Sequence, residues 1–82
     1  MAVSVRMDEQ MARDHLAQAE QHISLGREHI AKQKSIIAEL ERDGHDVALA
    51  NRLLATLLET QAAHEEHRRT ILGELGLYQP AP

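Results

Sequence analysis

Residues 15–40 read HLAQAEQHISLGREHIAKQKSIIAEL, and this stretch decides the fold. Written in sevens, it places an aliphatic residue at the same position of four successive repeats: Leu16, Ile23, Ile30 and Ile37. A second column follows three residues later: Ala19, Gly26, Gln33 and Leu40. Alternating steps of three and four residues keep one stripe of a helix facing a partner helix, as in a coiled coil. The stretch therefore predicts a long helix packed lengthwise against another one.

The composition favours an all-helical chain. Of the 82 residues 43% are hydrophobic, yet Phe and Trp are absent and Tyr78 is the single aromatic residue. Ala and Leu are strong helix formers, whereas strands favour β-branched and aromatic residues. Both prolines, Pro80 and Pro82, lie in the last three residues, so no proline interrupts the rest of the chain. The predicted fold class is all-α.

The sequence ERDGHD at residues 41–46 predicts a turn between two helices. Gly44 suits the left-handed conformation that follows a helix end, and Asp46 suits the N-cap of the next helix. So short a connection makes the helices antiparallel neighbours in a single hairpin domain over residues 8–76. The predicted segments are a flexible arm at 1–7, a helix at 8–43, a turn at 44–45, a helix at 46–75 and a flexible tail at 77–82.

Both predicted helices carry a stripe with the same spacing, and these stripes are expected to pack together. The residues predicted to form this packing interface are Leu16, Ile23, Ile30, Ile37, Leu40, Ala50, Leu54, Leu57, Ile71 and Leu75. Further apolar residues lie beside or off the stripe: Leu25, Ile36, Leu49, Leu53, Leu58 and Leu72. This surplus predicts a second interface, which a two-fold dimer would close by forming a four-helix bundle. The alternative is a monomeric hairpin whose broad stripe wraps its own seam.

The histidines at 15, 22 and 29 are the first candidates for chemistry. Seven residues advance a helix by about 10 Å, and zinc–nitrogen bonds are about 2 Å long, so neighbouring histidines of this ladder cannot share an ion. A turn centred at 44–45 would place His22 near His67 and Gly26 near His64. The candidate ligands of a metal site shared by the two helices are His22, His64, His67 and Glu66.

The motif evidence for this metal site is weak. HEEH at residues 64–67 does not have the spacing of the zincin motif HExxH. No histidine follows a glutamate by three residues, as it does in di-iron helical bundles. We therefore expect the histidines to border the packing stripe, and we expect no metal and no cofactor.

The histidines also suggest an alternative function. Protonation of all six adds six charges to a formal charge of −4, and imidazole titrates near pH 6.5. If histidines on the seam must stay neutral, mild acid would weaken the bundle. A histidine-based metal-binding or pH-responsive module is therefore the alternative to a structural or interaction role.

The composition argues against several other functions. Nine Lys and Arg are interspersed with thirteen Asp and Glu, whereas nucleic-acid binders usually carry a clustered basic face. The small basic group of Arg27, Arg68 and Arg69 lies beside Glu65 and Glu66, which favours solvated ion pairs. The absence of cysteine excludes disulfides, thiolate zinc sites and thiol catalysis. No serine lies in a pattern with a histidine and an acid, so we predict no catalytic residue and no enzyme activity.

The sequence also bears on location and partners. No apolar run of signal-peptide length occurs near the N-terminus, and no stretch approaches the roughly 20 apolar residues of a membrane span. We therefore expect a soluble, cytoplasmic protein that binds neither membrane nor nucleic acid. The expected function is protein–protein interaction in a structural or regulatory accessory role. The expected partner is a second copy in a homodimer. Another protein, which the sequence does not identify, is the other candidate partner.

The segments AEQHISLGREHIAKQKSIIAELERDGHD and LLETQAAHEEHRRTILGEL carry a resemblance to known proteins. The matching residues are His22, Ile23, Gln33, Ile37, Leu40, Gly44, His45, Asp46, Leu53, Leu54 and His64. On these residues, roughly residues 15–76 resemble a set of small helical-hairpin proteins of rhizobium-type alphaproteobacteria. The resemblance implies the helical-hairpin fold. Because that family has no established activity, it implies no function or site residue.

Overall fold

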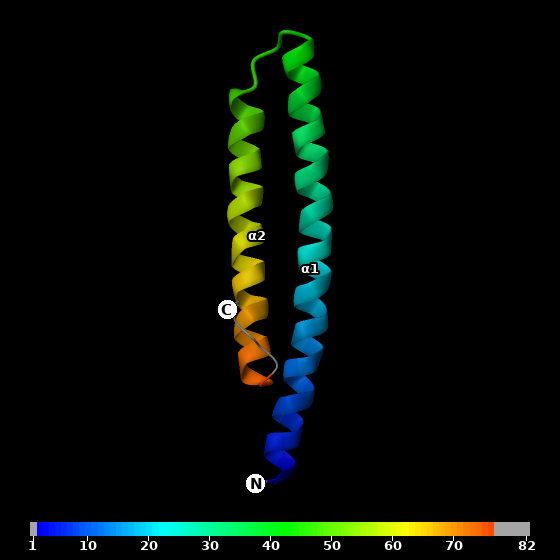
Figure 1. Ribbon diagram of the computed structural model, residues 1–82, viewed down its shortest axis with the longest axis vertical. Coiled ribbons are helices and arrows are strands. Elements are labelled where there is room, and N and C mark those ends of the chain that lie inside the picture. Colours follow the sequence, from blue (N-terminus) through cyan, green and yellow to red (C-terminus); the bar gives the residue numbers. More distant parts are fainter. Residues whose placement is uncertain (1, 77–82) are drawn as a thin grey trace, which may run out of the picture.

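The computed structural model describes residues 2–76, with side chains described from Glu9 onward. These residues form two helices, α1 (Ala2–Arg42) and α2 (Ala48–Glu74). The helices run antiparallel and side by side, and the N-terminal part of α1 extends beyond the end of α2 (Figure 1). The molecule is a rod that measures 63 × 28 × 15 Å. The prediction of an all-α helical hairpin is therefore confirmed.

Helix α1 begins earlier than predicted. Residues 2–7 were expected to form a flexible arm, but in the structure they continue the helix without a break. This segment contains neither proline nor glycine, so nothing in it interrupts the helical hydrogen bonds. Asp8, where the predicted helix begins, therefore lies inside α1. The predicted flexible tail at 77–82 lies outside the described residues.

The end of α1 is a Schellman motif centred on Gly44. This glycine has a φ of 76°, in the left-handed region that its sequence position predicts. The His45 amide donates to the Leu40 carbonyl oxygen at 2.9 Å, and the Gly44 amide donates to that of Glu41 at 3.1 Å. These two hydrogen bonds satisfy carbonyl groups that the helix end would otherwise leave free.

The connection between the helices is longer than the predicted two-residue turn. It spans residues 43–47, because α2 begins at Ala48 and not at Asp46. Val47 occupies the N-cap position, without a side-chain capping bond. Asp46 nevertheless satisfies one free amide of the helix, since its Oδ1 accepts a hydrogen bond from the Ala48 amide at 2.9 Å.

The helices pack through one narrow seam, formed by the stripes that the sequence predicts. Among the predicted packing residues, Ile23, Ile37 and Ile71 are buried. The others are half-buried on the same seam: Leu16, Ile30, Leu40, Ala50, Leu54, Leu57 and Leu75. Ala19 completes the buried apolar set, and no side chain in the described part is fully buried. Two helices alone thus form a thin core.

Two buried glutamines link the helices in opposite directions. Gln33 on α1 donates from Nε2 to the carbonyl oxygen of Ala50 on α2, at 3.0 Å. Gln61 on α2 donates from Nε2 to the carbonyl oxygen of Ile23 on α1, at 2.9 Å. Each glutamine is only 7% exposed. Because a buried amide without a partner is costly, each bond favours one axial alignment of the helices.

Gly26 provides the space for one of these links. A Cβ atom built on Gly26 would overlap Oε1 of Gln61 and approach its Cδ to 2.8 Å. The structure thus places Gln61 against Gly26, where the sequence predicted His64. The pairing differs from the predicted one by three residues, about one helical turn.

Replacing Gly44 with Ala should destabilise the hairpin by about 1 kcal/mol. The backbone there is left-handed, which costs a residue with a Cβ atom about that much. No atom lies within 4 Å of the added Cβ, so the loss reflects the backbone alone. Gly44→Asn should cost less, because asparagine tolerates this conformation. Urea unfolding of the three proteins tests this, and equal stability of all three would contradict it.

Two glycine substitutions within the helices should have different effects. Gly73→Ala adds a Cβ into open space and should stabilise α2 by up to about 1 kcal/mol. Gly26→Ala has the same helix-propensity gain but displaces the Gln61 amide, so it should be less favourable than Gly73→Ala by about 2 kcal/mol. In a Gln61→Ala background this difference should largely disappear. Equal effects of the two glycine substitutions in the wild-type background would contradict the observed packing.

Candidate functional site

Two open hollows lie along the seam, on opposite flanks. Residues two positions apart on a helix point about 200° apart, so Arg27 and His29 face opposite flanks of α1. Arg27 lines one hollow and His29 lines the other. The two flanks differ in chemistry, as described below.

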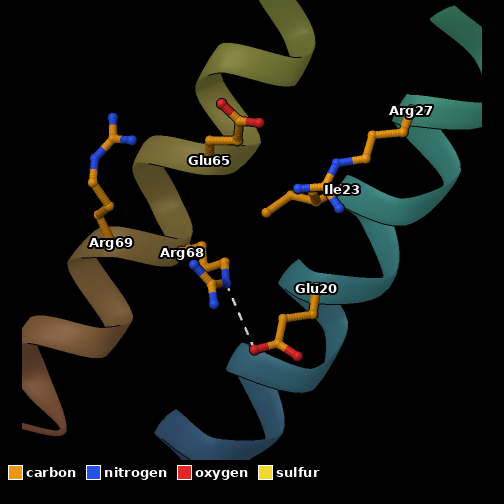
Figure 2. A pocket seen from close by; sticks show the side chains of 6 residues that line it. All are labelled: Glu20, Ile23, Arg27, Glu65, Arg68 and Arg69. Carbon is orange, nitrogen blue, oxygen red and sulfur yellow. Dashed lines mark ion pairs between the residues drawn. The ribbon is translucent and has the colours of Figure 1, made fainter. Parts of the chain in front are cut away.

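The first hollow is charged and measures about 400 Å³. Its lining residues are Glu20, Ile23, Arg27, Glu65, Arg68 and Arg69 (Figure 2). Arg68 Nε lies 3.6 Å from a carboxylate oxygen of Glu20, and the two side chains are 42% and 53% exposed. Such solvated ion pairs contribute little to stability. In Figure 2 the side chain of Arg69 points away from α1, so the three arginines do not converge on one point.

The second hollow is a mainly apolar groove of about 310 Å³. Its lining residues are His22, Leu25, Gly26, His29, Leu57, Thr60, Gln61 and His64. The ring centroids of His22 and His64 are 5.2 Å apart, and the rings are tilted by 45°. His22 therefore meets His64, not His67 as the sequence predicted, because the alignment of the helices differs by about one turn. No acidic residue lines this groove.

The structure assembles only half of the candidate metal site. Of the four candidate ligands, it brings together His22 and His64. His67 and Glu66 are exposed, and within residues 9–76 no group of three or more His, Asp or Glu residues is placed to hold a metal ion. A structural zinc site needs four ligands, so this pair would require two more from outside the hairpin.

The ladder histidines border the seam. His15, His22 and His29 are all exposed, while the neighbouring residues Leu16 and Ile30 are half-buried and Ile23 is buried. The three histidines therefore lie along one edge of the packing stripe, and His22 and His29 line the apolar groove. This is the position that the heptad spacing predicts for them.

Gln33 and Gln61 occupy positions with the spacing of the packing stripes, and the sequence alone assigns them no role. The signal was present, since a glutamine at an otherwise apolar position of such a stripe must find a hydrogen-bond partner. Which carbonyl group each amide reaches could not be read from the sequence. That depends on the alignment of residues that lie 17 and 38 positions apart.

Comparison with protein-family models, curated proteins and solved structures gives no match to this chain. Neither helix in residues 2–76 is both long and apolar enough to cross a membrane. What the hairpin can bind must therefore be inferred from its own surface.

The His22–His64 pair should make the hairpin less stable in mild acid. If both rings carry a proton, they are like charges that repel each other across the seam. At 5.2 Å this repulsion is worth up to about 0.8 kcal/mol in a water-like dielectric. Stability should therefore be lost as the pH falls from 7.5 to 5, as measured by urea unfolding.

A matched pair of variants tests the origin of this pH effect. His22→Gln removes the ring contact and should reduce the loss of stability in acid. His45→Gln removes an exposed histidine of the connection between the helices and should leave that loss unchanged. The same pH dependence in both variants would contradict a role for the pair.

Proposed function

We propose that this chain is a non-enzymatic, cytoplasmic helical interaction module that self-associates in a structural or regulatory accessory role. The proposed assembly is a homodimer in which two hairpins form a four-helix bundle with coiled-coil-like packing. The observation that carries the proposal is the distribution of apolar side chains. Among the residues whose side chains the structure describes, four apolar ones are buried, while six large ones are exposed: Met11, Leu25, Ile36, Leu49, Leu53 and Leu58.

The total surface of the chain also supports association. Its accessible area is 6517 Å², whereas a compact folded protein of 9.2 kDa exposes about 4,900 Å². The surplus is about 1,600 Å², twice the roughly 800 Å² that each partner buries in a standard interface. A second hairpin could therefore cover a full-sized interface without exceeding this surplus.

The small core gives a further reason to propose self-association. Chains below roughly 80 residues rarely gain enough stability from one core, and they commonly add disulfides, a metal or oligomerisation. This chain contains no cysteine, so disulfides are not open to it. Covering the exposed leucines with a second copy would enlarge the core by the hydrophobic effect.

A pH-responsive module is the second candidate function. It is supported by the 5.2 Å contact between His22 and His64 in a groove without an acidic residue. In this reading, protonation of the rings would alter the stability of the hairpin or of its assembly. The two functions are compatible, because a dimer could also respond to acid.

Sedimentation equilibrium tests self-association directly. The wild-type protein should have about twice its 9.2 kDa chain mass at high concentration, and its midpoint of thermal unfolding should rise with protein concentration. The useful range is about 1 μM to about 1 mM, which spans weak and moderate affinities. A mass of one chain throughout this range would overturn the proposal.

A further inference from the structure

We infer that the second copy docks on one particular side of the hairpin, the histidine-bearing side. We call this side the histidine face and define it by two stripes: positions 11, 15, 18, 22, 25, 29, 32 and 36 of α1, and positions 49, 53, 56, 60, 63, 67 and 70 of α2. The inference rests on the proposed self-association and names the surface that carries it.

The α1 stripe of the histidine face is a second stripe beside the packing seam. Its positions are separated by alternating steps of four and three residues, so they lie along one side of the helix. Its large apolar and histidine members are Met11, His15, His22, Leu25, His29 and Ile36. Lys32 is the one residue of this stripe with a fixed charge at neutral pH. Exposing the apolar side chains of this stripe to water is unfavourable. Covering the stripe removes few charged groups from water.

The α2 stripe of the histidine face carries no Lys, Arg, Asp or Glu at any of its positions. Leu49 and Leu53 are 73% and 50% exposed. The hydroxyls of Thr56 and Thr70 donate to the carbonyl oxygens of Arg52 and Glu66 in their own helix, each at 3.2 Å. These threonines therefore already satisfy their polar groups and can be covered by a partner without losing a hydrogen bond.

Both stripes lie on the same side of the hairpin. The apolar groove is lined by His22, Leu25 and His29 from α1 together with Thr60 from α2, so it joins the two stripes. Five of the six exposed large apolar residues lie on this side: Met11, Leu25, Ile36, Leu49 and Leu53. Leu58 is the exception, because helical spacing places it on the flank of Glu65.

The opposite flank is poorly suited to close contact with a second copy. At positions equivalent to the ladder histidines, α1 there carries the charged residues Arg13, Glu20, Arg27, Lys34 and Glu41. Glu65 and Arg69 follow on α2, and the Arg68–Glu20 ion pair spans this flank. Removing such charges from water is costly, and charged residues are depleted at the centres of interfaces.

The face suits a copy of itself better than a strongly charged partner. An isologous dimer brings the same patch of both copies together, so the patch must not repel itself. The histidine face meets this condition, because Lys32 is the only Lys, Arg, Asp or Glu among its positions. The groove of about 310 Å³ gives an exposed leucine or isoleucine of the partner a place to insert. The surplus surface of about 1,600 Å² is enough for this contact.

Matched substitutions test the histidine face. Leu25→Glu and Leu53→Glu each place a carboxylate on it, and Leu58→Glu is the control on the charged flank. All three leucines are similarly exposed, at 44%, 50% and 46%, so each variant hairpin should keep its fold. The first two should raise the dimer Kd by about 30-fold or more, as for central interface residues, and Leu58→Glu should leave it nearly unchanged. Circular dichroism checks that helicity is retained.

A labelling experiment gives a second readout that does not depend on a destabilising charge. Because the chain has no cysteine, a single introduced thiol reports on one position alone. Alkylation of Thr56→Cys on the histidine face should slow as protein concentration rises and dimers form. Alkylation of Glu59→Cys, on the exposed outer side of the same helix, should not slow.

The outcomes separate the surface from the function. A wild-type dimer that Leu58→Glu dissociates, while Leu25→Glu and Leu53→Glu do not, overturns the histidine face and leaves self-association standing. Equal alkylation of both cysteine variants at every concentration of a dimeric protein also overturns the face. A wild-type chain that stays monomeric overturns both proposals.

Discussion

The reciprocal hydrogen bonds of Gln33 and Gln61 are the constraint on which the rest of the structure depends. Apolar side chains in a 3–4 stripe pack almost equally well after a shift of one repeat, because hydrophobic contact is not directional. A buried amide is directional, and each glutamine reaches one carbonyl group of the other helix. The two bonds therefore select one alignment among several similar ones. Gly26 contributes by leaving the space that the Gln61 side chain fills.

This alignment decides what the two flanks of the seam contain. It brings His22 to His64 beside the apolar groove, and it brings Glu20 to Arg68 on the opposite flank. A shift by one turn would change both pairs while keeping the same stripe in contact. The candidate metal ligands illustrate the consequence, because the observed alignment leaves His67 exposed and joins only two of the four.

The thinness of the seam links the fold to the proposed function. Four buried apolar side chains and two buried glutamines make a small core for helices of 41 and 27 residues. Much apolar area remains in water, and it lies mainly on one face. The same face lacks acidic residues and carries histidines instead, whose charge depends on pH. Association and acid sensitivity would therefore draw on the same surface.

The sequence by itself determined the two helices, the stripe along which they pack and the left-handed conformation of Gly44. These features are local, because they follow from periodicity and from residue preferences within a few positions. The loop of residues 43–47 and the partners of His22 and Gly26 were decided only in the tertiary structure. The axial alignment depends on hydrogen bonds between residues 17 and 38 positions apart. No local pattern encodes such an offset, because every repeat of the stripe offers a similar apolar surface.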